Sequence, residues 1–310
     1  MTLSVPAVAE AAVPDVVRAV QNQLARGASV KFTQYGDVYL GARNKYDGHQ
    51  SNSYRFNLLQ NGTVLLGRRG VVAVGTTRQV RFNRYDLPLA KERAAEGDLV
   101  SQSLLAQGQP HRWVNTNGRF YSTGRLWTAG LPKGKTWAAR GARSAGATAF
   151  GDQVLNIFEI ATLKALIAHA DRRKFNLPNP SGKTPDLRVI GFYDGTITFA
   201  ELYRLSPAFR EVAGERPDPG YAKLALSWSI YFDRRGLPIK VTSGWHTDRQ
   251  KRPFSRGGAS IDFQSWGSAA TIAAPRPSQA GVVRAPAGGL PECDDMVEFI
   301  KEYARPTFEQ

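Results

Sequence analysis

The sequence predicts an α+β fold in which a strongly curved antiparallel β-sheet, a half-barrel, wraps over α-helices. The first observation is strand-like alternation of apolar and polar residues, clearest over Ala222–Phe232. The second is the content of 30 glycines and 18 prolines, which favours a turn-rich β protein over a helical bundle. The third is a helical stripe in the central stretch Gly118–Ala170, which must be buried against a sheet. That stripe consists of Leu163, Leu166, Ile167 and Ala170.

The chain begins with a predicted helix and a predicted strand. The helix is expected from Pro14 to Arg26, because Pro14 suits a first turn and Gly27 suits a C-terminal stop. Its stripe consists of Val16, Val17, Val20 and Leu24. The strand is expected over Ser29–Leu40, where one face carries Val30, Phe32, Val38 and Leu40.

Short strands and turns are expected from residue 53 to residue 85. Asn61-Gly62 predicts a tight hairpin turn, because both residues accept a positive φ. Arg68–Gly70 predicts a second turn, and Gln79–Tyr85 a further strand. Lys91–Ala106 is expected to be one helix with a weak apolar stripe.

The central stretch is expected to resume the sheet. Asn117-Gly118 predicts another hairpin, followed by strand-like pieces at Arg119–Tyr121 and Arg125–Trp127. A turn at Gly130–Gly134, a short strand around Trp137 and a loose Gly/Ala/Ser loop precede the central helix.

The C-terminal half alternates turns with strands. Asp194-Gly195 predicts a turn between two strands, and Thr198 with Glu201 fits a capping box. Ser206-Pro207 predicts another helix start. Further strands are expected at Ala222–Phe232, Ile239–His246, Ile261–Gly267 and Ala270–Ala274, with a turn at Asp233–Gly236. Residues 275–291 are expected to be a linker, before a short helix that starts near Asp294.

The charge and composition of the chain limit the classes of binding partner that are expected. The net charge of +15 and pI near 10.1 favour an anionic membrane or envelope surface. Nucleic acid is not the expected partner, because the basic residues are scattered and no nucleic-acid-binding motif is present. The single cysteine, Cys293, excludes a disulfide within the chain and a cysteine-rich metal site. No apolar run reaches the length of about 18 residues that spans a membrane.

Candidates for catalysis are few. The four histidines lie in no metal-ligand spacing, so no metal and no cofactor are expected. His111, Asp233 and His246 are the only weak catalytic candidates. Gly182-Lys183-Thr184 lacks the earlier glycine of a phosphate-binding loop, and Ser144 lacks the preceding glycine of a nucleophile elbow.

Apolar and aromatic residues are the candidates for ligand binding. Each is either part of a filled core or part of a cavity wall, because large aromatic rings serve both purposes. The candidates are Phe120, Trp127, Leu163, Leu166, Phe192, Trp228 and Trp245.

The order of these stretches resembles the actinobacterial relatives of the LolA-like lipoprotein-carrier fold, similar to the LppX and LprG lipoproteins. The matching stretches are GRFYSTGRLWTAGLPKGKTW, FGDQVLNIFEIATLKALIAHA, GTITFAELYRLSPAFREV, KLALSWSIYFDRRGLPIKVTSGW and IDFQSWGSAATIAAPRP. The resemblance implies a half-barrel of about eleven strands over helices, with an apolar cavity between them.

The resemblance also implies a domain organisation and a location. It covers residues 14–277, which are then the half-barrel domain, and residues 278–310 follow as a linker and short helix. Residues 1–13 are expected to be a flexible N-terminus or a signal-peptide remnant, because small residues recur there in A-x-A spacing. The chain departs from the pattern because no lipobox cysteine lies near its N-terminus. An extracytoplasmic location, secreted or in the cell envelope, is expected; the cytoplasm is the alternative.

Three functions remain open at this point. The first is non-catalytic binding or carriage of a lipid or other hydrophobic ligand. The second is an enzyme of cyclase or isomerase type that uses the same cavity. The third is an envelope-stress sensor of the anti-sigma-factor-binding type.

Overall fold

The computed structural model describes residues 14–40, 54–149, 154–175, 188–217, 219–246, 255–284 and 286–291. The predicted N-terminal segment 1–13, Cys293 and the predicted helix near Asp294 lie outside these residues.

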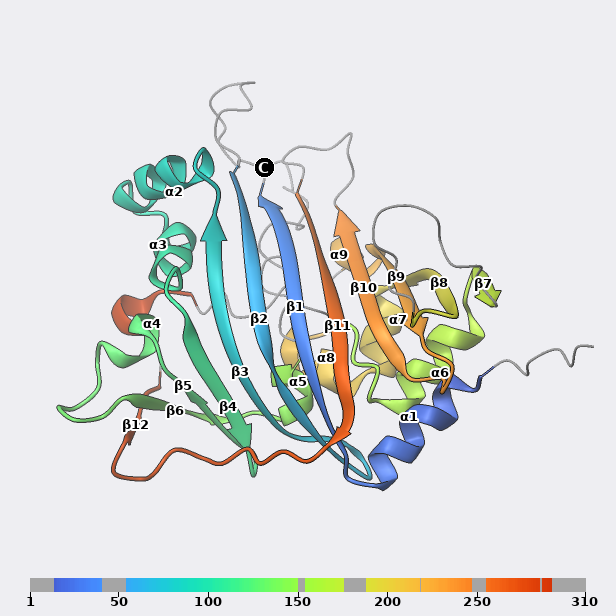
Figure 1. The fold of residues 1–310 in the computed structure, drawn as a ribbon. Coiled ribbons are helices and arrows are strands. Elements are labelled where there is room, and N and C mark those ends of the chain that lie inside the picture. Colours follow the sequence, from blue (N-terminus) through green and yellow to red (C-terminus); the bar gives the residue numbers. More distant parts are fainter. Residues whose placement is uncertain are drawn as a thin grey trace, which may run out of the picture.

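The described strands form one large open sheet of twelve strands, in the order β12-β6-β5-β4-β3-β2-β1-β11-β10-β9-β8-β7 (Figure 1). Every neighbouring pair is antiparallel except β12 and β6, which are parallel. The strands are β1 Ser29–Leu40, β2 Tyr54–Gly67, β3 Gly70–Phe82, β4 His111–Thr116, β5 Arg119–Ser122, β6 Trp137–Ala142, β7 Arg172–Phe175, β8 Gly191–Thr198, β9 Ala225–Phe232, β10 Pro238–His246, β11 Arg256–Ser268 and β12 Ala280–Val282. The predicted α+β class with an antiparallel sheet is therefore confirmed.

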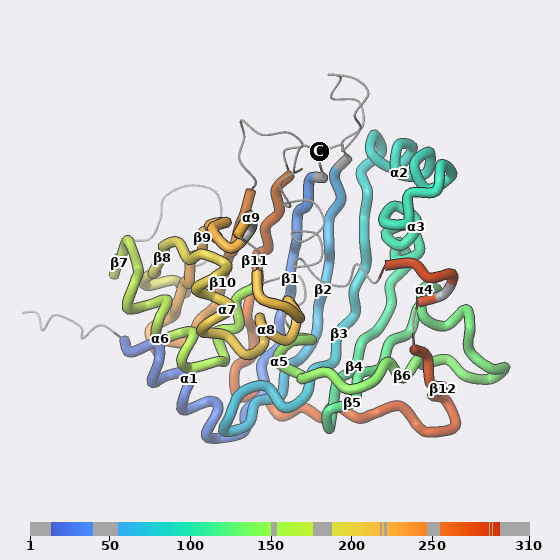
Figure 2. The backbone as a smooth tube through the Cα atoms, turned by 180° about the vertical axis from the view of Figure 1, so that it is seen from behind, coloured from blue at the N-terminus to red at the C-terminus, as the bar shows by residue number. Residues whose placement is uncertain are grey.

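The helices lie on one face of this sheet, which we call the inner face (Figure 2). One group, α1 and α6 to α9, lies towards β7 to β11, and a second group, α2 to α4, lies towards β3 to β6. Helices α1 and α2 also contact β2, and α5 contacts β3, β4 and α8. The helix bounds are α1 Val16–Ala25, α2 Asp86–Ala95, α3 Leu99–Ala106, α4 Arg125–Thr128, α5 Ala145–Ala149, α6 Ile160–Ala168, α7 Phe199–Leu205, α8 Pro207–Ala213, α9 Pro219–Ala222 and the 3-10 helix η2 Ala287–Gly289.

One core joins the inner face to the helices. Strand β1 contributes Val30, Phe32 and Val38, in the alternation that its sequence predicts. Helix α1 buries its predicted stripe in the same core, through Val16, Val20 and Leu24. The stripe of α6 is buried there as well, through Leu163 and Leu166. Burial of these alternating and periodic positions holds the two layers together.

Two predicted hairpin turns are wrong. Asn61-Gly62 lies inside β2 and Asp194-Gly195 lies inside β8. Glycine is needed at both places because another chain segment comes close, since a Cβ on Gly62 would lie 2.3 Å from the carbonyl oxygen of Gly75. A Cβ on Gly195 would lie 3.0 Å from the indole of Trp228. The turn at Arg68-Arg69 is confirmed between β2 and β3. The hairpin at Asn117-Gly118 is also confirmed, and both of its residues have positive φ.

Three further predictions need correction. Arg125–Trp127 belongs to helix α4 and not to a strand, because Leu126 and Trp127 pack together against Ala138 of β6. Lys91–Ala106 is divided into α2 and α3 by a turn at Gly97, whose φ of 96° favours glycine. The expected strand at Gln79–Tyr85 is the end of β3, which stops at Phe82.

The segment after β11 crosses the face opposite the helices, which we call the outer face, and returns to the sheet at β12 (Figure 1). The expected strand at Ala270–Ala274 does not form, and the isoleucine of this stretch, Ile272, lies against Gly75 of β3. The residues that the sequence assigned to a linker include β12, which pairs with β6 from Ala280 to Val282. The sheet thus continues past Pro277.

Candidate ligand-binding site

Four polar side chains form a row across the middle of the inner face, on four neighbouring strands. Gln34 of β1 lies opposite Gln60 of β2, Gln60 lies opposite Arg78 of β3, and Arg78 lies opposite His111 of β4. Their exposed fractions are 1% for Gln34, 1% for Gln60, 0% for Arg78 and 4% for His111. Directly opposite side chains in an antiparallel pair have Cβ atoms about 5 Å apart, so the members of this polar row are neighbours on the sheet.

The two glutamines are the unusual members of the polar row. Both atoms of the Gln34 amide and both atoms of the Gln60 amide are buried, and none of the four has a hydrogen-bond partner. A buried polar group without a partner costs roughly 1–3 kcal/mol, so proteins rarely retain one without a reason. Two adjacent amides in this condition therefore mark a place where a polar group from outside the chain would be stabilised.

The other end of the row is connected to the helices. Nη1 of Arg78 donates to Oε1 of Gln107, the C-cap residue of α3. Nε2 of Gln107 donates to the hydroxyl of Ser103 at 3.4 Å, and that hydroxyl donates to the carbonyl oxygen of Pro291 at 2.7 Å. The guanidinium of Arg78 also lies 5.2 Å from the ring centre of Trp113. These contacts fix the position of Arg78, and they tie the C-terminal part of the described chain to α3.

Small residues lie beside the glutamines. Gly36 of β1 lies opposite Ala259 of β11, one inner-face position along from Gln34. Gly257 follows on the same face, opposite Val38. Gly36, Ala259 and Gly257 therefore carry little side-chain bulk of their own, and Leu58 of β2 lies 3.1 Å from the position that a Cβ on Gly36 would take.

Two tryptophans of the inner face lie next to these small residues. Trp245 of β10 lies opposite Gly257, and Trp228 of β9 lies opposite Ser243. Their indole nitrogens are buried without a hydrogen-bond partner. Buried side-chain atoms without a hydrogen-bond partner therefore lie on both sides of the small residues, on the glutamines of β1 and β2 and on the tryptophans of β9 and β10.

The structure divides the residues that the sequence proposes for ligand binding into three places. Trp228 and Trp245 share the main core with Leu163 and Leu166. Phe120 and Trp127 lie towards the β6 end of the sheet, where the guanidinium carbon of Arg140 lies 4.5 Å from the first ring centre and 3.4 Å from the second.

Phe192 occupies the third place. It alternates with the inward-facing Tyr193 along β8, and its ring lies 5.6 Å from that of Tyr231 on the outer face. Tyr193 packs in the main core, where burial raises the pKa of its phenol. Only the group around Trp228 and Trp245 therefore lies near the two glutamines.

The weak catalytic candidates are not gathered in one cluster. His111 belongs to the polar row, whereas His246 is exposed at the end of β10. Strands β4 and β10 are five positions apart in the sheet, which corresponds to about 24 Å. Asp233 lies in the turn between β9 and β10, where its carboxylate accepts hydrogen bonds from the backbone of Arg235 and Leu237. Each of these residues therefore has separate surroundings.

The outer face carries a hollow of about 370 Å³ over β8, β9 and β10. It is lined by polar side chains, among them Ser227, Ser229 and Thr242. The carboxylate of Asp194 at its edge binds the guanidinium of Arg172 through two hydrogen bonds, which raise the pKa of Arg172. The polar lining of this hollow suits water better than a hydrophobic ligand.

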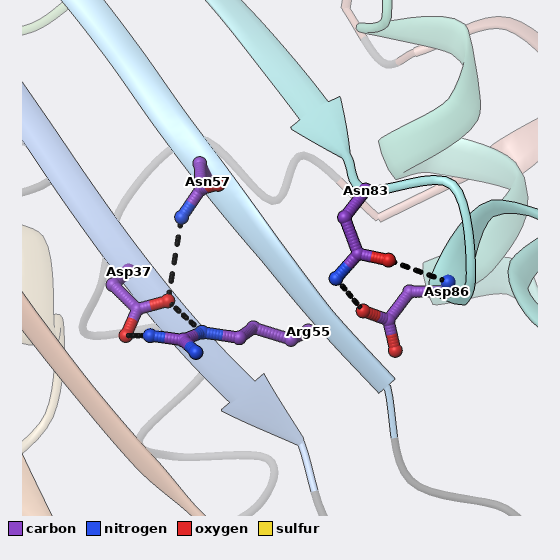
Figure 3. Close-up of polar contacts among 5 residues, drawn as sticks. All are labelled: Asp37, Arg55, Asn57, Asn83 and Asp86. Carbon is purple, nitrogen blue, oxygen red and sulfur yellow. Dashed lines mark hydrogen bonds and ion pairs between the residues drawn. The ribbon is translucent and has the colours of Figure 1, made fainter.

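In a second polar cluster, on the outer face, the polar side chains form hydrogen bonds with one another (Figure 3). The carboxylate of Asp37 on β1 accepts two hydrogen bonds from Arg55 and one, at 3.3 Å, from Asn57. The hydrogen bond from Arg55 to Asp37 raises the pKa of Arg55. In the same view, Asn83 accepts a hydrogen bond from the backbone of Asp86 at 2.9 Å, where α2 begins. Both groups hold strand and helix ends in place.

The described residues contain no group of three or more histidine, cysteine, aspartate or glutamate side chains that would hold a metal ion. Within the same residues, no helix has both the length and the apolar character to cross a membrane.

Sequence reasoning missed Gln34 and Gln60, although a signal for one of them was present. In β1 every second residue points inward, and the inward positions include Val30, Phe32 and Val38. The same period places Gln34 among these apolar residues. For Gln60 the signal was hidden, because the sequence predicted a turn at the next two residues. The pairing of the two amides depends on the register between β1 and β2.

No family model and no curated protein matches this sequence. Among the solved structures that are similar to it over most of their lengths are the following two. A DUF1329 family protein from Desulfovibrio piger has 9% identity and a TM-score of 0.25, and the match covers 81% of this chain and 92% of that one. A LolA superfamily protein from Nitrosomonas europaea has 9% identity and a TM-score of 0.22, and the match covers 84% of this chain and 96% of the other. The fold described above rests on the sheet order and register of this chain itself.

Proposed function

We propose that this protein binds and carries a lipid or another hydrophobic ligand, without catalysis, between the inner face of its sheet and the helices. The proposal includes a sheet that curves around the ligand as a half-barrel. The observation that carries it is the surface formed by the two glutamines, the small residues of β1 and β11, and the two tryptophans. This surface is apolar overall and includes buried polar atoms that no group of the described chain satisfies.

An amphipathic ligand fits this surface better than a purely polar one. Its apolar body would lie against Trp228, Trp245 and the small residues, and each Å² of apolar surface removed from water contributes about 25 cal/mol. An acyl chain that buries a few hundred Å² would therefore bind favourably after ordering costs are subtracted. Its polar end would satisfy buried polar atoms that otherwise destabilise the protein.

The arrangement of the helices suggests how a ligand would enter. Both helix groups reach the middle of the sheet, because α1 of the first group and α2 of the second each contact β2. Strands β1 and β2 carry Gln34 and Gln60. Binding between these strands and the helices requires the helices to move away from the sheet, and a relative shift of the two helix groups is one such motion.

The ligand can be detected without knowing its identity. Full-length protein would be purified without detergent and examined by native mass spectrometry, and then by organic extraction of bound lipid. A fluorescent fatty-acid analogue would measure binding to the emptied protein. We expect a bound species of lipid mass or saturable binding of the probe; a protein that carries no lipid and does not bind the probe would overturn the proposal.

A substitution that adds bulk beside Gly36 tests whether the ligand binds at the inner face. Ala259→Phe would place a ring on the small residues beside Gly36, so we expect it to reduce probe binding at least tenfold. Thr33→Phe introduces the same ring on the exposed side of β1 and should leave binding unchanged. Thermal melting would show whether the first variant is folded, and Ala259→Leu offers a smaller obstruction if it is not.

The proposal also includes an extracytoplasmic location and contact with anionic surfaces. The net charge of +15 favours association with anionic membranes or envelope polymers. Sedimentation with vesicles that contain anionic lipid, compared with neutral vesicles at two salt concentrations, tests this part separately. Equal association with both kinds of vesicle would contradict it.

A further inference from the structure

Gln34 and Gln60, which lie opposite each other on β1 and β2, define what the polar end of the ligand must offer. Each primary amide has an N–H₂ group that donates and an oxygen that accepts. All four of these atoms are buried and unpartnered, so the pair presents donors and acceptors together. A ligand group that only accepts hydrogen bonds, such as a simple ester, would leave the two glutamine oxygens unsatisfied.

The placement of the pair adds a positional constraint. Gln34 lies between two apolar neighbours of the inner face, Phe32 and Gly36 on its own strand, and opposite Ile261 of β11. On the other side, Gln60 lies opposite Arg78, which the bond to Gln107 holds towards α3. The glutamine pair thus lies between apolar residues of β1 and β11 on one side and Arg78 on the other.

We propose that Gln34 and Gln60 bind the head group of an acyl ligand that carries a hydrogen-bond donor and an acceptor side by side, as an N-acyl amide does. This inference rests on the proposed function and specifies its ligand class. The acyl chain then extends over Gly36 and Ala259 towards Trp228 and Trp245, while the amide exchanges hydrogen bonds with the two glutamines. A ligand with the same chain and no donor binds more weakly, because two buried acceptors remain unpaired.

The test compares two ligands of equal chain length on three proteins. N-lauroyl ethanolamine offers a donor and an acceptor, whereas methyl laurate offers acceptors alone. Competition of each compound against a fluorescent fatty-acid analogue gives its Kd for the wild type, for the double variant Gln34→Leu/Gln60→Leu, and for Gln264→Leu. Gln264 is an exposed residue of β11 and controls for the loss of an amide elsewhere on the sheet.

We expect the wild type and the Gln264→Leu control to bind the N-acyl amide about tenfold more tightly than the ester. The double variant should bind the two compounds equally and keep its affinity for the ester. It should also melt at a temperature equal to or above that of the wild type, because replacing two unpartnered buried amides by apolar groups of similar size removes a cost. A merely structural role for the glutamines would lower the melting temperature instead.

The outcomes separate this inference from the function on which it rests. If neither compound binds any of the three proteins, the proposed function fails. If both compounds bind but the wild type does not distinguish them, or if the double variant keeps the preference, the glutamine pair is satisfied by water and the inference is wrong. Should the double variant not fold, the single variants Gln34→Met and Gln60→Met take its place in the same comparison.

Discussion

The carboxylate of Glu159, at the N-terminus of α6, accepts a hydrogen bond from the hydroxyl of Ser206, the N-cap residue of α8. Its other oxygen accepts the backbone N–H of Ala208 at 2.7 Å. One side chain therefore binds the first turn of a second helix, far away in the sequence. Helices α6 and α8 of the larger helix group are joined at their N-terminal ends as one unit.

Replacing the carboxylate of Glu159 should destabilise the contact between α6 and α8. Glu159→Ala leaves the buried hydroxyl of Ser206 and the N–H of Ala208 without their acceptor, so we expect a loss of about 2–3 kcal/mol in the free energy of unfolding. Urea denaturation measures it. Glu159→Gln keeps one acceptor oxygen in place and should lose less than half as much. Equal stability of the alanine variant and the wild type would contradict the role given to Glu159.

Two glycines on neighbouring strands, Gly62 of β2 and Gly75 of β3, should differ in their tolerance of a methyl group. A Cβ on Gly62 would lie 2.3 Å from the carbonyl oxygen of Gly75, which is a severe overlap with backbone. A Cβ on Gly75 would make an ordinary contact of 3.5 Å with Ile272. We expect Gly62→Ala to cost about 1–3 kcal/mol and Gly75→Ala less than about 0.5 kcal/mol in denaturation experiments. Similar costs for the two variants would contradict the close approach at Gly62.

The capping box at the start of α7 should make the stability of the protein depend on pH, with a sign that follows from the pKa of Glu201. Hydrogen bonds from the backbone and hydroxyl of Thr198 lower the pKa of Glu201, which completes a reciprocal capping box. A carboxyl whose pKa is lowered by folding stabilises the protein above its unfolded pKa, and that contribution disappears as the pH falls through its folded pKa. The stability difference between the wild type and Glu201→Gln should therefore shrink between about pH 5 and pH 3.

The capping prediction has a simple control. Thr198→Ala removes the hydroxyl that accepts from the backbone of Glu201, so it should cost about 1 kcal/mol at neutral pH. It also removes the hydroxyl's donation to the carboxylate, so its pH dependence below pH 5 should be weaker than that of the wild type. A constant difference between the wild type and Glu201→Gln across this range would show that Glu201 does not titrate as proposed.

Arg140 is expected to stabilise the β6 end of the sheet. Its guanidinium lies over the rings of Trp127 and Phe120, and it donates to the hydroxyl of Ser122 at 3.2 Å. Arg140→Met keeps most of the apolar stem and removes the cation, so we expect a loss of about 1–2 kcal/mol.

A second arginine provides the comparison for Arg140. Arg84 lies over the ring of Tyr85, at 4.6 Å from its centre, and that tyrosine is 73% exposed. Arg84→Met should cost less than about 0.5 kcal/mol, because water competes with an exposed cation–π contact. If the two methionine variants were equally stable in urea, burial of the Arg140 cluster would have no energetic role.

Local patterns were sufficient for much of the fold. The alternation in β1 and β9, the stripe of α1 and the capping box at Thr198 were all visible in the sequence and are present in the structure. Each of these features depends on residues that are close in the chain, so the spacing of side chains alone determines it. The same reasoning failed at Gly62 and Gly195, because a glycine that makes room for another strand looks like a glycine that makes a turn.

The candidate site was harder to predict, because it depends on register. Gln34 and Gln60 become neighbours only when β1 and β2 pair along their whole lengths, and Ala259 joins them from a strand more than 190 residues further on. The sequence proposed Trp228 and Trp245 from their strand pattern, and both lie on the inner face near this pair. It also proposed Phe192, which the alternation of β8 directs to the outer face.

The two strands at the ends of the sheet have a consequence for self-association. An unpaired strand edge invites pairing with another molecule, and long flat edges lead to aggregation. Here β12 extends over only three residues, and β7 carries three consecutive cations, Arg172, Arg173 and Lys174, in four residues. Among the described residues, a second copy that approached either margin would find little backbone to pair with at β12 and repelling charge at β7, so neither edge favours edge-to-edge pairing.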